Sequence, residues 1–444
     1  MEQARVDELA EFLAIPSISA DEAHATDVQR AGEWVSAYVR ASGGRCDLLP
    51  TPTGHPLVVG EVPASASPST APTVMVYGHF DVQPAGDHAL WTSDPFEPVV
   101  RDGWLYGRGT VDDKGNLFIL LKAIRGLAEA GELPVNVRVL CDGEEEIGGT
   151  SVVDFLASDA RTTEACVIYD STMPRIDKPS FEVGTRGLAY FKVNVRTAER
   201  DLHSGLFGGA ALNALHVLID ALRAVTSVPD ELKAGVIEAT AEERESWSQL
   251  DPGADVLAAE GARPADGQAA VEFYSRTFAT PAVDVNGITG GEPDLVKTVL
   301  PVEARANVSI RLAPGQNVDE VSRAFKTLLR GALAPGADLD VVRVNASPAG
   351  RVDPSEQAVV LARDAFERAM GSRPLLTRTG GTLPIVPALE AKGIPTVLTG
   401  FGVPGHNMHG PNERLLVRYL VSGVDVTAEM FRAFGSLGAR QARV

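Results

Sequence analysis

Strand-like and helix-like segments alternate along residues 1–186, and this alternation restricts the fold of the 444-residue chain more than any other feature. Buried-strand patterns cover about residues 73–81, 135–141 and 165–170. Helical patterns cover about residues 26–42 and 116–131. Such alternation predicts an α/β fold with a mostly parallel central sheet.

A different pattern interrupts this one between about residues 188 and 351. It predicts strands at 189–197, 298–301 and 303–314, helices at about 209–225, 230–248 and 318–333, and a loop at 251–270. From about Val352 the first pattern returns, with a helix at 354–370, a strand at 394–400 and a terminal helix from about Asn412. We therefore expect one α/β domain of residues 1–187 and 352–444, and an inserted α+β domain of residues 188–351.

Composition excludes several classes of protein. The hydrophobic content of 44% and the charged content of 22% are typical of a folded globular chain. The net charge of −19 argues against nucleic acid and anionic membrane surfaces as partners. The three cysteines, Cys46, Cys141 and Cys166, form no CxxC pair, and the N-terminus has no secretory pattern. These features predict a cytoplasmic protein with reduced thiols.

Acidic residues and histidines follow several of the predicted strands. They are His79 and Asp81, Asp112 and Asp113, Glu144 to Glu146, Asp170, and the loop histidines His406 and His409. Each has an ordinary structural explanation. A lone HxD is usually structural, an Asp pair can cap a helix, and a run of three glutamates is usually a solvated turn.

Taken together, these residues favour a metal site over separate structural roles. The carboxyl ends of strands in an α/β sheet meet at one edge, where binding sites form. Carboxylate oxygens and imidazole nitrogens suit zinc, with manganese or cobalt as alternatives. Because there are too many acids for one four-coordinate ion, we expect two divalent ions that share a bridging carboxylate.

Six motifs resemble those of a known family: YGHFDVQP, GRGTVDDKG, DGEEEIGG, VIYD, DLHSG and MHGPNE. In this order they are similar to the zinc-dependent exopeptidases that include carnosinase-type and other cytosolic dipeptidases, aminoacylases and glutamate carboxypeptidases. The resemblance covers most of the chain and weakens at residues 230–295. KTVLP and SIRLAP indicate the dipeptidase branch.

The resemblance implies a catalytic metal-binding domain, an inserted lid/dimerisation domain and a homodimer formed through the insert. It implies the metal ligands His79, Asp112, Glu146, Asp170 and His409, with Asp112 as the bridge and a cis peptide bond after it. Glu145 would be the general base on a metal-bridging water, Asp81 would orient His79, and His203 would stabilise the oxyanion. The implied substrate-binding residues are Arg311, Thr298, Gly381 and Thr382.

The implied reaction is hydrolysis of dipeptides or short peptides that have a free C-terminal carboxylate. Carnosinase-type members tend to have Arg-Glu-Gly-Gly-Ser where this chain has RTGGT at residues 378–382, so an acid is missing at Thr379. This difference keeps open N-acyl amino acid hydrolysis on the same metal centre. A non-catalytic metal-binding homologue is a third alternative. Glu144 matches no family role, and we expect it either to support the site from behind or to face solvent.

Overall fold

The structure is a computed structural model, and it describes residues 2–438. The chain packs into two compact units. The first unit consists of residues 1–183, 352–377 and 388–444, and the second of residues 184–351 and 378–387. No helix in the described part of the chain is long and apolar enough to cross a membrane.

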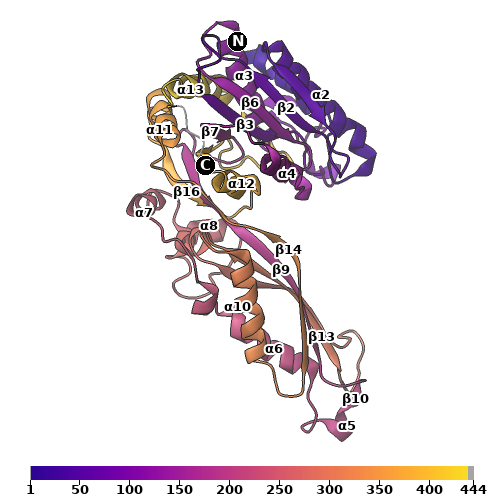
Figure 1. Cartoon of the computed structure of the whole chain (residues 1–444). Helices are drawn as coiled ribbons and strands as arrows, with labels where there is room; N and C mark the ends of the chain where they lie inside the picture. Colours follow the sequence, from indigo (N-terminus) through magenta and orange to yellow (C-terminus); the bar gives the residue numbers. More distant parts are fainter. Residues whose placement is uncertain (1, 439–444) are drawn as a thin grey trace. The chain divides into compact units, whose positions relative to one another are not determined.

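A six-stranded sheet forms the centre of the first unit, in the order β1–β2–β6–β3–β7–β17 (Figure 1). The strands are β1 Arg45–Leu49, β2 Leu57–Val62, β6 Asn136–Asp142, β3 Thr73–His79, β7 Ala165–Ile168 and β17 Thr396–Leu398. The pairs β6–β3, β3–β7 and β7–β17 are parallel, whereas β1–β2 and β2–β6 are antiparallel. The predicted α/β class with a mostly parallel sheet is therefore confirmed, and the antiparallel pairs lie at one edge.

Helices of the first unit cover this sheet. They are α1 Glu2–Leu13, α2 Ala25–Ala41, α3 Lys114–Glu129, α4 Ser151–Ser158, α11 Gln357–Met370 and α13 Tyr419–Phe434. Helix α2 packs on β1 and β2, α3 packs on β3, and α13 contacts both α3 and α11. The middle of α3 is apolar on nearly every side because it lies between the sheet and other helices, as the burial of residues 117–121 shows.

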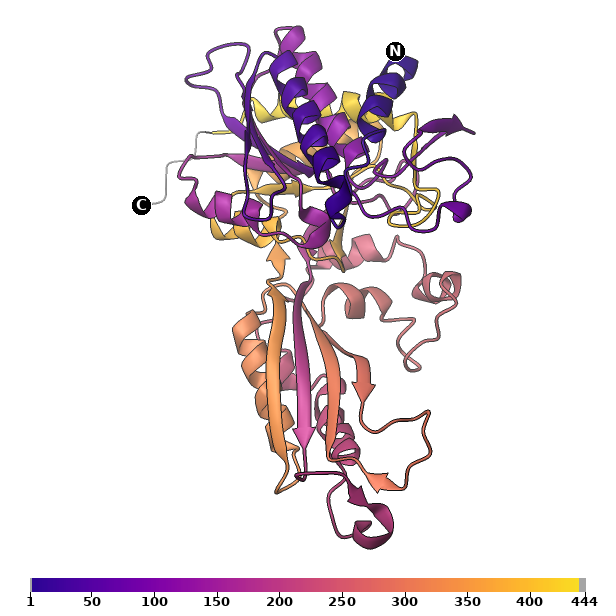
Figure 2. The same ribbon diagram turned by 90° about the vertical axis from the view of Figure 1, so that its right-hand side faces the viewer.

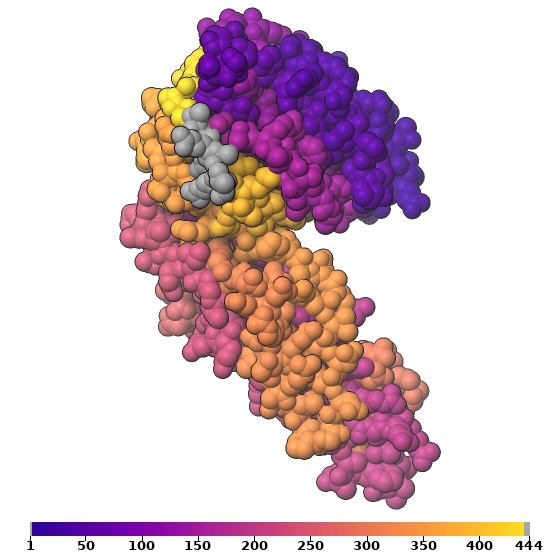
Figure 3. Space-filling view, viewed as in Figure 1, coloured from indigo at the N-terminus to yellow at the C-terminus, as the bar shows by residue number. Residues whose placement is uncertain are grey.

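The second unit has two layers. Its four-stranded antiparallel sheet has the order β11–β13–β9–β14, from β11 Ala282–Thr289, β13 Glu303–Leu312, β9 Gly187–Arg196 and β14 Asp338–Ser347. Helices α6 Ala214–Thr226 and α10 Val318–Gly331 lie along one face of this sheet (Figure 2). In the space-filling view α10 and β14 form much of the orange surface of this unit (Figure 3). The alternating burial of β9 reflects one packed face and one open face.

Shorter elements complete the chain. The strands are β4 Val99–Arg101, β5 Trp104–Tyr106, β8 Ser180–Thr185, β10 Leu202–His203, β12 Val299–Leu300, β15 Gly350–Arg351, β16 Leu375–Thr379 and β18 Arg414–Leu416. The helices are α5 Ser204–Phe207, α7 Ala241–Trp247, α8 Gly253–Ala259, α9 Phe273–Phe278 and α12 Ile385–Ala391. Single 3₁₀ turns occur at Glu22–His24, His88–Leu90, Glu145–Ile147 and Asp230–Leu232.

Several sequence predictions were wrong in detail. The helix expected at 230–248 is only a 3₁₀ turn and the short α7, and the expected loop at 251–270 contains α8. The terminal helix begins at Tyr419 rather than near Asn412, because residues 414–416 form β18 instead. Residues 378–387 pack with the second unit, although we assigned them to the first domain.

Candidate metal centre

Three neighbouring parallel strands bring acidic and histidine side chains together at their carboxyl ends, in the first unit's sheet. His79 is the last residue of β3, Asp170 follows β7 by two residues, and β6 ends at Asp142, shortly before Glu145 and Glu146. Because β6, β3 and β7 are adjacent and parallel, their carboxyl ends coincide.

Two loops complete the cluster. Asp112 lies just before α3, and the peptide bond between Asp112 and Asp113 is cis. His409 lies in the loop before β18 and has a φ of 59°, in the left-handed region that a residue with a side chain seldom adopts. Asn407 and Asn412 of the same loop also have positive φ values. Such backbone conformations persist where the surroundings hold them in place, and they often occur at functional sites.

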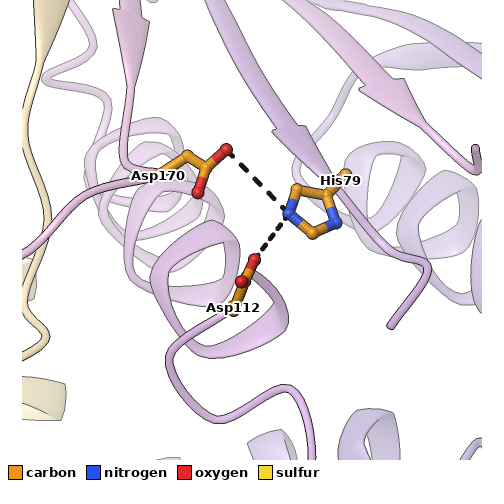
Figure 4. A group of neighbouring side chains, drawn as sticks. All are labelled: His79, Asp112 and Asp170. Atoms are coloured by element: carbon orange, nitrogen blue, oxygen red, sulfur yellow. Dashed lines mark hydrogen bonds and ion pairs between the residues drawn. The ribbon is translucent and has the colours of Figure 1, made fainter. Parts of the chain in front are cut away.

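The distances define two groups that share one carboxylate. His79 Nε2 lies 2.9 Å from Asp112 Oδ1 and 4.0 Å from Asp170 Oδ2 (Figure 4). His409 Nε2 lies 2.7 Å from Asp112 Oδ2 and 3.3 Å from Glu146 Oε2. In each group the candidate ligand atoms lie within 4.8 Å of one another. The two oxygens of Asp112 therefore face different histidines, which is the arrangement that a bridging carboxylate needs.

Asp81 is buried behind the two ligand groups and contacts a residue of each, His79 and Glu146. The Nδ1 of His79 lies 3.1 Å from the main-chain oxygen of Asp81 and 3.4 Å from its Oδ1. The Asp81 carboxylate also accepts the backbone N–H groups of Glu145 at 3.3 Å and Glu146 at 3.1 Å. Asp81 thus contacts the histidine mainly through its main-chain oxygen, and its carboxylate holds the turn that carries the two glutamates.

Gln83 is a residue of the site that our sequence analysis missed. Its backbone N–H donates to Glu146 Oε1 at 3.2 Å, and its Nε2 donates to Glu146 Oε2 at 2.8 Å. Both oxygens of Glu146 are therefore held by one residue. A signal was present, since Gln83 follows His79 and Asp81 at the same two-residue spacing in YGHFDVQP.

The three consecutive glutamates have different environments. The Glu144 side chain is fully buried, where its Oε1 accepts the Ser151 N–H at the start of α4 and its Oε2 accepts the Thr53 hydroxyl. Glu146 belongs to the second ligand group. Glu145 lies between them, and its carboxylate has no such anchor among the described residues. Of the two alternatives for Glu144, the solvent-facing one was wrong, because the carboxylate is buried and caps the start of α4.

Carboxylates crowd this site strongly enough to shift its pKa values. Burial and the neighbouring Asp112 carboxylate raise the pKa of Asp170 to about 7. Burial, together with Asp170, Asp81 and Glu146, holds the pKa of Glu145 well above its usual range. Hydrogen bonds that the His409 ring donates to the Asp112 and Glu146 carboxylates raise the pKa of His409 to about 10. The group therefore retains protons that bound cations would displace.

The donor set fits two divalent ions. Each group offers one imidazole nitrogen and oxygens from two acids, with Asp112 common to both. Four of the five candidate ligand side chains are at least nine-tenths buried, and His409 is half exposed. His406 belongs to neither group, and its Nδ1 accepts the Met408 N–H at 2.9 Å within its own loop.

The other predicted site residues lie in the second unit. His203 pairs with Val299 across β10–β12, and just beyond this pair the Ser204 N–H donates to the Thr298 main-chain oxygen at 2.9 Å. Arg311 Nη1 donates to Thr382 Oγ1 at 3.2 Å, and Thr382 Oγ1 donates to the Arg186 oxygen at 2.9 Å. Gly381 precedes Thr382, and its N–H donates to Thr379 Oγ1 at 3.1 Å.

The sequence is similar to those of known peptidases. The sequence profile of peptidase family M20/M25/M40 matches residues 75–433. The chain is 30% identical over 418 residues to a cysteinylglycine-S-conjugate dipeptidase of Corynebacterium striatum, covering 91% of this chain and 90% of the relative.

Solved structures of peptidases are similar to this structure as well. The structure is similar to that of an M20 family metallo-carboxypeptidase of Sulfolobus solfataricus, with a TM-score of 0.80, 25% identity and coverage of 97% and 99% of the two chains. It is also similar to human carnosine dipeptidase 1, with a TM-score of 0.73, 26% identity and coverage of 98% and 97%.

Proposed function

This chain belongs to peptidase family M20/M25/M40, and from that premise we propose that it is a dinuclear zinc dipeptidase. The reaction would be hydrolysis of the peptide bond in dipeptides or short peptides with a free C-terminal carboxylate. The observation that carries the proposal is the position of Asp112, whose two oxygens lie 2.9 Å and 2.7 Å from the imidazoles of His79 and His409.

The residues of the first unit have different proposed roles. His79 and Asp170 would hold one ion, Glu146 and His409 the other, and Asp112 would bridge them, with manganese or cobalt as alternatives to zinc. Such ions supply Lewis acidity and lower the pKa of a water molecule. Asp81 orients His79 through its Nδ1.

Glu145 is the proposed general base. Its raised pKa, caused by burial and by Asp170, Asp81 and Glu146, is the kind of perturbation that suits proton transfer near neutral pH. Its carboxylate accepts a proton from the attacking water and later donates it to the leaving amine. Hydrogen bonds hold the carboxylates of Glu144 and Glu146 but not that of Glu145. The Glu145 carboxylate is therefore available for the reaction.

Two residues of the second unit are proposed to recognise the substrate. His203 Nδ1 accepts the Gly205 N–H at 3.0 Å, so the ring proton lies on Nε2, which can donate to a developing oxyanion. Arg311 offers a planar guanidinium to the free C-terminal carboxylate, with Thr382 as its hydrogen-bonded neighbour. Thr298 and Gly381 would line the same substrate site.

A panel of unblocked dipeptides, including cysteinylglycine and β-alanyl-histidine, tests this proposal. We expect the purified protein to release free amino acids, to lose this activity in a chelator and to regain it when zinc is added back. Two bound ions with no hydrolysis across the panel would instead favour the non-catalytic alternative.

N-acyl amino acid hydrolysis is the second candidate, and Thr379 favours it. The Thr379 hydroxyl is used inside its own turn, where it accepts the Gly381 N–H at 3.1 Å, and it offers no negative charge to a substrate ammonium group. Comparison of free with N-acetylated dipeptides separates the candidates. Turnover of acetylated substrates alone would remove the dipeptidase proposal.

We also propose a cytoplasmic homodimer that forms through the second unit as a lid and dimerisation domain. The net charge of −19 supports a protein whose partners exclude nucleic acid and anionic membrane surfaces. Its partners would then be its peptide substrate and a second copy of itself.

A further inference from the structure

We propose that a buried ion pair between Arg108 and Glu413 positions the metal centre by fixing the turn that carries Asp112 and the loop that carries His409. This inference rests on the proposed function, because it assigns a role towards the same two ions. Both side chains are almost completely buried, and Arg108 Nη1 lies 2.6 Å from Glu413 Oε2.

The Glu413 carboxylate is surrounded by hydrogen-bond donors from the Asp112 turn. Oε2 accepts the Gly109 N–H at 3.0 Å in addition to the Arg108 bond. Oε1 accepts the Val111 N–H at 2.8 Å and the Asp112 N–H at 3.2 Å. The turn therefore wraps around a single anion, and the last of these bonds reaches the backbone of the proposed bridging ligand itself.

Arg108 extends the same network to the other loops of the site. Its Nη2 donates to the main-chain oxygens of Pro84 at 3.2 Å and of His409 at 3.3 Å. The guanidinium also lies 5.4 Å from the ring centre of Trp91. One side chain thus contacts the Asp112 turn, the segment after Gln83 and the proposed ligand His409.

The spacing in sequence explains why one pair can control both loops. Arg108 precedes Asp112 by four residues, and Glu413 follows His409 by four residues. The ion pair therefore joins the two loops close to the point where each presents a ligand. A buried ion pair is weak evidence for stability alone, since apolar residues often serve as well. Four donors converging on one carboxylate are better explained by the need to fix a turn.

The Glu413→Gln variant tests this role. An amide offers one acceptor oxygen and one NH₂ donor to the same four donors, so the turn cannot be held as before. Because Asp112 would be shared, we expect both zinc sites to weaken, by about 10- to 100-fold. The measurement is the zinc affinity of the full-length protein by competition with a chromophoric chelator, with no substrate present.

A matched control and a second variant separate positioning from stability. Glu243→Gln breaks another buried pair, with Arg378 at 2.6 Å in the second unit, which contains none of the five proposed ligands. We expect it to lower the melting temperature but to leave zinc affinity within about twofold. Arg108→Lys keeps the positive charge but loses the guanidinium hydrogen bonds to the Pro84 and His409 oxygens. This variant should therefore fold, yet bind zinc more weakly than wild type.

The outcomes are distinct. Weakened zinc binding in Glu413→Gln or in Arg108→Lys, with unchanged binding in Glu243→Gln, supports the inference. If the folded variants keep wild-type zinc affinity and only their melting temperature falls, the inference is overturned. The proposed function survives that result if the wild-type protein binds two ions and hydrolyses dipeptides. If the wild-type protein binds none of zinc, manganese and cobalt, both fall together.

Discussion

At the scale of single residues, neighbours in sequence have unrelated roles. Glu144, Glu145 and Glu146 form one acidic run, yet the first caps a helix, the second has no anchor and the third joins a ligand group. Motif resemblance predicts a ligand role for Glu146 and a general-base role for Glu145, and it gives no role to Glu144. The role of Glu144 depends on Thr53 and on the start of α4 at Ser151, and no local pattern reveals those contacts.

The Glu145→Gln variant should lose turnover while it keeps its metal. Because an amide cannot accept the proton of the attacking water, we expect kcat to fall by roughly 10²- to 10⁴-fold. Metal content after dialysis should be unchanged. Steady-state kinetics on a dipeptide, together with elemental analysis of the same sample, make the measurement.

Glu144→Gln is the neighbouring control. It weakens a buried cap, so it should lower the free energy of unfolding by about 1–2 kcal/mol and leave kcat within a fewfold of wild type. Near-normal turnover in Glu145→Gln would show that the general base is another group.

At the scale of elements, strands were predicted better than the ends of helices. The strands β3 and β6 lie close to their predicted positions because their apolar runs are buried on both faces of the sheet. The terminal helix was misplaced because residues 414–416 pair with β5 in a small sheet, which overrides their local preference. Likewise, Arg108 lies in the motif GRGTVDDKG and Glu413 in MHGPNE, but only the fold shows that they meet.

Strand β8 carries a buried acid that gives a pH-dependent prediction. Burial raises the pKa of Glu182 from 4.5 to about 7, and Ser171 Oγ donates to its Oε1 at 3.0 Å. Between these pH values the unfolded chain has lost this proton and the folded chain keeps it. The contribution of Glu182 to stability therefore falls as pH rises from about 4.5 to about 7.

Glu182→Gln removes this titration. Relative to wild type, the variant should gain up to about 3 kcal/mol in free energy of unfolding at pH 8, and this gain should shrink towards pH 5. Thermal unfolding of both proteins across this pH range measures the difference. A difference that is constant with pH would show that Glu182 does not titrate in this way.

At the scale of the whole molecule, the alternation of strands and helices predicted the fold class correctly. It did not predict that residues 378–387 pack with the second unit. The reason is a long-range contact, since Arg378 pairs with the buried Glu243 and donates to the oxygens of Ile237 and Glu238. Long-range ion pairs of this kind leave no periodic signal in the sequence.

The proposed homodimer can be tested by mixing two inactive variants. If His203 acts in the site of the other subunit, a heterodimer of Glu145→Gln and His203→Ala contains one site in which both residues are intact. After subunit exchange, about a quarter of all sites should then be active. Activity of the mixture no higher than that of the separate variants would contradict a shared site.

The central claim is that two cations neutralise the acids gathered around Asp112. The most direct test is the zinc content of purified protein, measured by elemental analysis after zinc loading and dialysis, for wild type and for Asp112→Asn. We predict two zinc ions per wild-type chain and the loss of both in the variant, because Asp112 faces both histidines. A wild-type chain that hydrolyses dipeptides with no bound metal would contradict the account.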